Sequence, residues 1–305
     1  MQGLSRIIGV PATIRVGSVL GTLSSYLFKR EKQISIAQLN IPEAQRLILK
    51  DREQIVRENF SHVGESIAEL LCIKSIFDLK DINNHSPINR ELEGFSCQGF
   101  HNIFALLEKG GMVISGHIGS IELLAAYHVQ RGIPLHVIAR SSNYSSAQRS
   151  LEKLRKSYGI TTIWRENPSS MRELTSALKS GAVIAALIDQ DVALASTYSN
   201  FLGLPAAYPI APIKIAIRYN IPIVSTFIYR LRHRKHHIYT KKIDYNPEDK
   251  DCEQKILDEY GRRLGKVVIA YPEQWLWWHR RWRRQPNTEQ IPSTKKYIEW
   301  LNQIK

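Results

Sequence analysis

The stretch Met112-Val-Ile-Ser-Gly-His-Ile-Gly-Ser-Ile-Glu-Leu-Leu-Ala-Ala126 decides the fold class of this chain. A short apolar run is followed by a segment that contains Gly116 and Gly119, and then by a second apolar run after Ser120. Glycine favours turns, and serine is a preferred residue at the N-cap of a helix. The stretch therefore predicts a buried strand, a tight turn and a helix over 120–131.

The same alternation of strand and helix extends from about residue 96 to residue 271. Short apolar runs predict strands at 112–115, 135–139, 161–164, 182–188 and 222–229. Amphipathic segments predict helices at 99–109, 120–131, 145–158, 169–180, 209–220 and 250–271, and residues 42–80 also carry a helical apolar spacing. This order is typical of an α/β protein with a mostly parallel central sheet flanked by helices.

The composition is that of a globular protein with an excess of positive charge. The chain has 305 residues, of which 43% are hydrophobic and 23% charged, and its formal net charge is +14. Such a charge predicts an anionic partner, whether nucleic acid, an anionic lipid surface, or an acidic protein or substrate. The three cysteines show no CxxC spacing, so neither a disulfide framework nor a thiolate metal site is indicated.

The N-terminal segment 7–28 is mainly small and apolar and is flanked by basic residues. Its uncharged part, 16–28, is shorter than the roughly 20 apolar residues that an ordinary membrane span needs. No secretory cleavage signature is present. Two interpretations remain open: a helix that lies in a membrane interface, and an ordinary buried first helix.

His117 and Glu122 place a base and a carboxylate at the junction of the predicted strand and helix. On one straight helix five residues rotate by about 500°, so the two can meet only if His117 lies in the turn. The imidazole would then accept a proton from an attacking hydroxyl, and the carboxylate would fix its tautomer. Amides at the helix N-terminus would stabilise a developing oxyanion. The alternative is a helix-start histidine beside a solvated glutamate.

Polar side chains also follow two other predicted strands. Arg140 follows the strand 135–139, and Asp189-Gln190-Asp191 follow the strand 182–188. The carboxyl ends of parallel strands meet at one edge of a sheet, so these groups and His117 are expected to share a cleft. Arg140 would clamp a phosphate or pair with a carboxylate. The two aspartates would bind a cation, hold an arginine or cap the following loop.

Three further segments are strongly basic. The predicted helix 145–158 carries several basic residues, interpreted as a solvated face: Arg149, Lys153, Arg155 and Lys156. The run 230–237 is typical of a basic hairpin or loop between two strands. Residues 271–284 interleave four tryptophans with four arginines. That last segment fits stacking on single-stranded nucleic acid, an aromatic and cationic belt at a membrane interface, or a terminal helix that packs its tryptophans on the core with its arginines outside.

Several of these segments, in this order, resemble the late acyltransferases of lipid A biosynthesis, the lauroyl and myristoyl transferases that act on Kdo-lipid IVA. The resemblance covers the chain from about residue 30 to residue 286. It rests on Gly116–Glu122; on Leu135-His-Val-Ile-Ala-Arg140; on Asp189-Gln-Asp191 with Phe201-x-Gly203-x-Pro205-Ala206 and Pro209; on the tryptophan–arginine segment; and on Asn40-Ile-Pro-Glu43. The histidine–acid motif is shared with other glycerolipid acyltransferases, whereas the Asp-Gln-Asp block and the tryptophan–arginine segment are more specific.

The resemblance implies an acyltransferase domain over 31–290, an apolar membrane-associating segment over 1–30 and a C-terminal tail over 291–305. It also implies that the protein works on the cytoplasmic face of the bacterial inner membrane. His117 carries over as the general base and Glu122 as its partner. The residues expected to bind substrate are Arg140, Arg149, Asp189, Gln190 and Asp191.

The implied reaction moves a fatty acyl chain from acyl carrier protein, or from coenzyme A, to a hydroxyl of a lipid A precursor. A thioester donor needs only an activated hydroxyl and an oxyanion site, so no metal or organic cofactor is expected. Acyl carrier protein is acidic, and the glycolipid acceptor and inner-membrane lipids are anionic. All of them would be attracted to a protein of charge +14.

Two alternatives differ in the acceptor or in the class of protein. In the first alternative, the acceptor is a phospholipid or another glycolipid, and the base chemistry is the same. A nucleic-acid-binding protein would use the basic tryptophan-rich segment and would not need His117. The basic residues do not form a single stripe, and therefore no nucleic-acid partner is expected.

Overall fold

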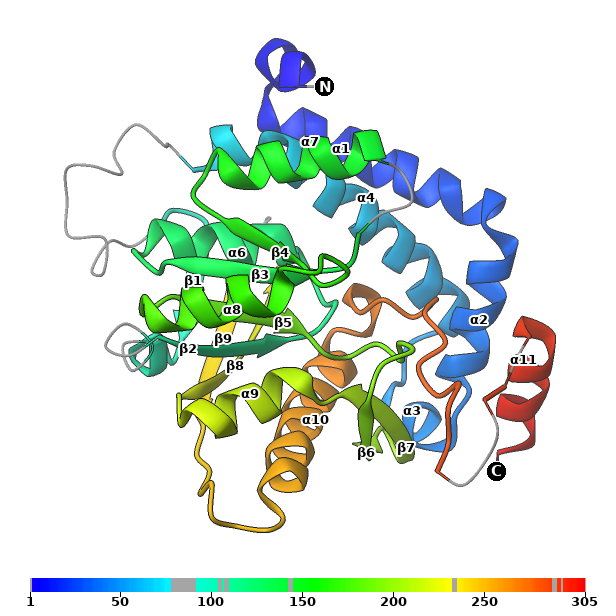
Figure 1. Ribbon diagram of the computed structural model, residues 1–305. Coiled ribbons are helices and arrows are strands. Elements are labelled where there is room, and N and C mark those ends of the chain that lie inside the picture. The colour runs from blue at the N-terminus through cyan, green and yellow to red at the C-terminus, as the bar shows by residue number, and fades with distance from the viewer. Residues whose placement is uncertain are drawn as a thin grey trace.

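A computed structural model describes residues 2–77, 92–103, 106, 110–141, 145–231, 235–286, 290–291 and 293–304. A seven-stranded sheet forms the centre of the molecule, and helices lie on both of its faces (Figure 1). The strands of this sheet, in chain order, are β1 (Phe95–Gln98), β2 (Gly111–Ser115), β3 (Leu135–Ala139), β4 (Thr161–Trp164), β5 (Val183–Leu187), β8 (Ile223–Arg230) and β9 (His236–Ile243). A separate antiparallel hairpin consists of β6 (Ser196–Phe201) and β7 (Leu204–Pro209).

The order of the central sheet is β1-β9-β8-β2-β5-β3-β4. Every neighbouring pair in it is parallel except β8 and β9, which are antiparallel. The prediction of an α/β protein with a mostly parallel sheet is thus confirmed. The basic run 230–237 contains the end of β8 and the start of β9, as expected for a hairpin, although 232–234 lie outside the described residues.

The side chains of the central strand β2 alternate between two apolar layers, as the pleat of a strand requires. Met112 and Ile114 pack in the larger core, whereas Val113 packs in a core on the opposite face. The larger core includes side chains from α8 (Ser170–Lys179), α9 (Ala211–Tyr219) and α10 (Cys252–Ala270). The opposite face is covered by α6 (Ile121–Gln130), and the basic helix α7 (Ser145–Lys156) leads into β4.

In the part of the chain that the structure describes, four helices precede the sheet: α1 (Gln2–Leu27), α2 (Lys29–Leu39), α3 (Pro42–Leu47) and α4 (Arg52–Ile76). The helical spacing over 42–80 is therefore interrupted at 48–51. The break is stabilised by Asp51, whose carboxylate accepts from Gln54 N at 2.8 Å and caps α4. Within the described residues, no helix combines the length and the apolar character that crossing a membrane requires.

α1 and α4 lie against each other at backbone contact (Figure 1). A Cβ atom at Gly21 would lie 2.2 Å from the carbonyl oxygen of Phe60, and one at Gly64 would lie 2.0 Å from that of Gly17. Small residues four apart, such as Gly17 and Gly21, allow two helix backbones to approach this closely. Ser18 and Ser61 hydrogen-bond across the same contact at 2.7 Å.

A side chain at Gly21 should force α1 away from α4. We expect Gly21→Val to lower the free energy of unfolding by about 1–3 kcal/mol, the usual cost of overpacking a close contact. Leu20→Val, on the exposed face of the same helix, is the control and should change stability by less than about 0.5 kcal/mol. Urea unfolding measures both. Equal stability of the two variants would contradict the close helix contact.

The tryptophan–arginine segment packs its tryptophans on the core, as one of its three interpretations stated. It is not the expected helix, however, but a 3₁₀ turn (Pro272–Gln274) followed by loops, and Arg281 is buried with the tryptophans. Trp275, Trp277 and Trp282 are 2% exposed or less. Two buried amides from the N-terminal helices hold its backbone. Asn59 Nδ2 donates to the carbonyl oxygens of Glu273 and Trp275, and Gln38 Nε2 donates to those of Trp277 and His279. A last helix, α11 (Thr294–Gln303), lies beside α2 (Figure 1).

Candidate active site

His117 lies in the predicted turn between β2 and α6. A Cβ atom at Gly119, whose φ is +63°, would lie 2.2 Å from the carbonyl oxygen of Ile228, so the turn requires glycine there. The tryptophan segment fixes the other side of the turn. Gly119 N donates to the carbonyl of Gln274 at 3.0 Å, and Leu276 N donates to the carbonyl of His117 at 3.0 Å. The histidine backbone is therefore held before any substrate binds.

Asp189 is the carboxylate that contacts the imidazole of His117. His117 Nδ1 lies 2.7 Å from Asp189 Oδ1, and Asp189 Oδ2 accepts from His117 N at 2.7 Å and from Trp275 Nε1 at 2.9 Å. An ionised carboxylate only accepts hydrogen bonds, so Nδ1 carries the proton and Nε2 keeps a lone pair. The side chain of His117 is 25% exposed, which leaves it accessible to a substrate.

The environment of Asp189 keeps it ionised. The side chain is 1% exposed, and burial by itself would raise its pKa. Attraction to His117 and the hydrogen bonds from His117 and Trp275 outweigh that effect and lower the pKa of Asp189 to about 2. A buried anion at Nδ1 stabilises the imidazolium that would form when Nε2 accepts a proton.

The structure corrects the expected partner of His117. The sequence interpretation paired His117 with Glu122, but the carboxylate of Glu122 accepts from Arg155, at 2.5 Å from Nη2 and 3.1 Å from Nε. Sheet register explains the difference. β2 and β5 pair with Ser115 opposite Leu187, so continuing both strands by two residues brings His117 beside Asp189. Glu122 lies in the first turn of α6 and contacts Arg155 of α7 instead.

The Glu122–Arg155 pair lines an apolar cavity between α6 and the sheet. Arg155, which was interpreted as part of a solvated face, is only 12% exposed in this bidentate contact. The cavity is lined by apolar side chains of β2, β3, β5 and α6, among them Val113, Leu124, Leu135, Val137 and Leu187, together with Ser115. Ser115 lies two residues before His117 in the chain, so the part of the cavity that Ser115 lines adjoins the turn.

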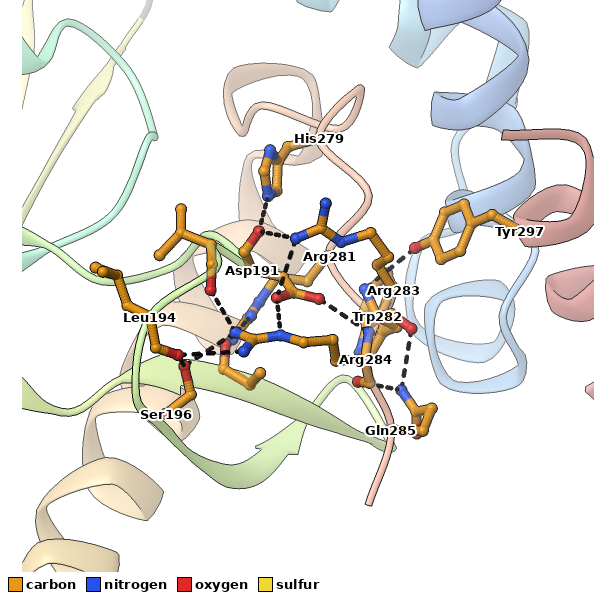
Figure 2. A network of polar contacts seen from close by, with 12 residues as sticks. Asp191, Leu194, Ser196, His279, Arg281, Trp282, Arg283, Arg284, Gln285 and Tyr297 are labelled. Atoms are coloured by element: carbon orange, nitrogen blue, oxygen red, sulfur yellow. Dashed lines mark hydrogen bonds and ion pairs between the residues drawn. The ribbon is translucent and has the colours of Figure 1, made fainter. Parts of the chain in front are cut away.

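Asp191 serves to hold the C-terminal segment. Its carboxylate accepts from Arg284, at 2.5 Å from Nε and 2.9 Å from the backbone N, and its carbonyl accepts from His279 Nε2 and Arg283 Nη2 (Figure 2). Arg284 also donates to the loop before β6, at Val192 and Ser196. Of the alternatives weighed for this aspartate, the structure shows the one in which it holds an arginine. Gln190 lines a second, polar cavity.

The remaining predicted substrate contacts lie at the surface. Arg140 follows β3 and Arg149 lies on α7; both are exposed, and neither lines the two cavities. Sequence reasoning missed Trp275 as a donor to Asp189 and Arg155 as the partner of Glu122. The tryptophan was one of four in a segment with three interpretations. The arginine belonged to a helix whose basic residues indicated a solvated face.

The site thus combines a histidine with an accessible basic nitrogen, a buried carboxylate behind it and an adjoining apolar cavity. A family model of bacterial lipid A biosynthesis acyltransferases matches residues 4–284 of this chain. The chain is 21% identical over 288 residues to the lipid A biosynthesis palmitoleoyltransferase of Escherichia coli (strain K12), across 90% of this chain and 86% of that protein. The lipid A biosynthesis acyltransferase of Shigella flexneri matches with the same identity and coverage.

The chain therefore belongs to the bacterial lipid A biosynthesis acyltransferase family. The resemblance drawn from the sequence motifs is confirmed.

Proposed function

We propose that this protein transfers a fatty acyl chain from a thioester, carried by acyl carrier protein or coenzyme A, to a hydroxyl of a lipid A precursor. The observation that carries the proposal is the His117–Asp189 pair, with Nδ1 bonded to a buried carboxylate and Nε2 left as a base. Family membership supplies the reaction class. The apolar cavity beside the turn supplies a place for the acyl chain.

In this mechanism His117 acts first as a general base and then as a general acid. Nε2 takes the proton of the acceptor hydroxyl as its oxygen attacks the thioester carbonyl, and a new C–O bond forms. The C–S bond of the tetrahedral intermediate then breaks, and the imidazolium returns its proton to the departing sulfur. Asp189 stays ionised throughout and stabilises the imidazolium.

We assign Arg155 to the oxyanion and Glu122 to positioning Arg155. A guanidinium held bidentately has a fixed orientation, and its charge would stabilise the oxygen that becomes negative in the intermediate. Glu122 and His128 both line the apolar cavity and lie six residues apart on α6, which spans about 9 Å along the helix. The cavity has a volume of about 70 Å³, which is room for a few carbons of a fatty acyl chain beside the reacting carbonyl.

We further propose that α1 lies on the inner membrane at its cytoplasmic face. Val16, Val19, Leu20, Leu23 and Leu27 are 40–80% exposed and recur at helical spacing, on the side of α1 away from the glycines that contact α4. A lone exposed leucine is ordinary, but a continuous apolar stripe on one helix is typical of membrane-surface binding. The excess positive charge of the chain favours anionic lipids.

Charged residues in that stripe should release the protein from membranes. Leu20→Glu with Leu23→Glu is expected to reduce co-sedimentation with phosphatidylglycerol-containing vesicles by at least about tenfold, because each buried side chain contributes about 1.5–3 kcal/mol. Met171→Glu, an exposed apolar residue on α8, is the matched control and should bind like the wild type. Unchanged binding of the double variant would argue against α1 as the membrane contact.

The reaction itself is tested with the purified protein, Kdo-lipid IVA and lauroyl, myristoyl and palmitoleoyl thioesters of acyl carrier protein and coenzyme A. The expected product is the acceptor with one added acyl group, detected by mass. An acylated phospholipid in the same assay, with the glycolipid unchanged, would move the proposal to another lipid acceptor. No acylated product from any donor would overturn it.

A further inference from the structure

A second cavity, distinct from the apolar one, opens between α2 and the C-terminal segment next to the candidate base. It has a volume of about 330 Å³, within the range of small-ligand sites, and its lining includes Gln190, Leu276 and Trp278. Gln190 follows Asp189 in the chain, and Leu276 N donates to the carbonyl oxygen of His117 at 3.0 Å. Two residues that line the cavity, Gln190 and Leu276, therefore connect it to the His117–Asp189 site.

This cavity concentrates positive charge. Arg30, Arg280 and Arg283 all line it. Burial, followed by repulsion from Arg283 and Arg30, lowers the pKa of Arg280, so Arg280 is close enough to both to be destabilised by their charge. Glu31 also lines the cavity and lies 3.5 Å from Arg30, and the Asp191 carboxylate lies 3.7 Å from Arg283, so the two acids offset part of the charge. An anion placed among the three arginines would relieve the repulsion that remains.

Several contacts hold the basic side chains in place before a ligand binds. Both Nε and Nη2 of Arg30 donate to Thr294 Oγ1, at 3.0 and 2.9 Å. Arg283 donates to the carbonyl of Asp191 at 3.2 Å, and His279 does so at 3.1 Å, as Figure 2 shows. Fixed donors lose less conformational freedom on binding than mobile surface lysines would. The lining thus comes from three distant segments, α2, the loop after β5 and the tryptophan–arginine segment, and α11 holds Arg30 in place.

We propose that this cationic cavity binds a phosphate group of one of the two substrates and thereby holds that substrate against His117. Guanidinium groups match the geometry of phosphate oxygens and bind them bidentately. The proposal rests on the acyl transfer proposed above. Both substrates offer the chemistry, since a lipid A precursor carries sugar phosphates and both thioester donors carry the phosphate of a phosphopantetheine arm.

Phosphate binding is tested first without catalysis. Inorganic pyrophosphate should raise the unfolding temperature of the wild type, because a ligand that binds only the folded state stabilises it. Arg280→Gln and Arg30→Gln should each weaken the apparent affinity by about tenfold or more, the effect of losing one charge-assisted contact. Arg172→Gln, an exposed arginine on α8, is the control and should keep the wild-type shift.

The proposed phosphate site would be overturned if pyrophosphate did not raise the unfolding temperature of the wild type, or if it raised that of both variants by the wild-type amount. Because Arg30 is 62% exposed, its variant tests the site even where Arg280→Gln lowers stability. The shift in unfolding temperature is measured without turnover. A failure of phosphate binding can therefore be distinguished from a failure of the proposed acyl transfer.

Kinetics then identify the substrate whose phosphate occupies the cavity. If the acceptor supplies it, Arg280→Gln and Arg30→Gln should raise the KM for Kdo-lipid IVA about tenfold with little change in the KM for the thioester. A rise confined to the thioester KM would assign the cavity to the donor phosphate. Unchanged KM values for both substrates would contradict its role in substrate binding, whatever pyrophosphate does.

Discussion

His117→Ala should lower the rate of acyl transfer by about 10²–10⁴-fold, the range that a positioned general base contributes. The loss should fall on kcat, because the imidazole acts on the reacting hydroxyl and lines neither of the two cavities assigned to substrate binding. The measurement is the initial rate of formation of the acylated glycolipid, with both substrates saturating.

A loss of activity counts only if the variant remains folded. His117→Ala leaves the Asp189 carboxylate with hydrogen bonds from the backbone N–H at position 117 and from Trp275 Nε1, so the buried anion keeps two donors. We therefore expect a cooperative unfolding transition close to that of the wild type. Near-normal turnover by a folded His117→Ala protein would contradict the assignment of His117 as the general base.

Asp189→Asn should be almost as damaging, with an expected loss of about 10²–10⁴-fold in kcat. The asparagine amide cannot stabilise an imidazolium by charge. Its NH₂ group can also favour the tautomer in which Nε2, not Nδ1, carries the proton, so that the base is blocked. Since the pKa of Asp189 is lowered to about 2, the wild-type carboxylate is ionised at any assay pH near neutrality, whereas the asparagine carries no charge at any pH.

Asp258→Asn is the matched control for this substitution. Asp258 is an exposed residue on α10, and its carboxylate accepts from Ser199 Oγ at 2.6 Å and from Gln254 Nε2 at 2.7 Å, neither of which belongs to the His117 turn. The same loss of one carboxylate there should leave the rate unchanged. Equal losses in both variants would point to a general effect of charge and not to the contact with the imidazole.

Much of the central sheet could be predicted from the sequence because its strands are short apolar runs with clear ends. The expected strands at 135–139 and 161–164 coincide with β3 and β4, and those at 112–115, 182–188 and 222–229 match β2, β5 and β8 to within one residue at each end. Buried parallel strands carry apolar residues on both faces, which makes them conspicuous. The helices between residues 120 and 271 could be predicted because their apolar residues recur at helical spacing and form one face.

The elements that were missed have weaker signals. β6 and β7 are polar or proline-containing and pair with each other as a hairpin outside the main sheet. β1 is a four-residue strand at the sheet edge. The predicted helix at 99–109 lies partly outside the described residues, and the division of the chain at residues 30 and 290 stays a prediction.

The site was predicted in part, and its limits follow from topology. The sequence indicated that His117 would lie in a strand-to-helix turn and that the Asp-Gln-Asp block would end a strand. It did not reveal that those strands are neighbours, because β2 and β5 are separated in the chain by β3, β4 and three helices. A carboxylate five residues away therefore looked like the natural partner, although the sheet register supplies one that is 72 residues away.

The most direct test of the central claim is a single-turnover measurement of the mass of Kdo-lipid IVA after mixing with an acyl thioester and an excess of protein, either wild type or Asp189→Asn. The His117–Asp189 mechanism predicts one added acyl group with the wild type and a first-order rate at least about 10²-fold lower with the variant. Equal rates of acyl addition by the two proteins would contradict it.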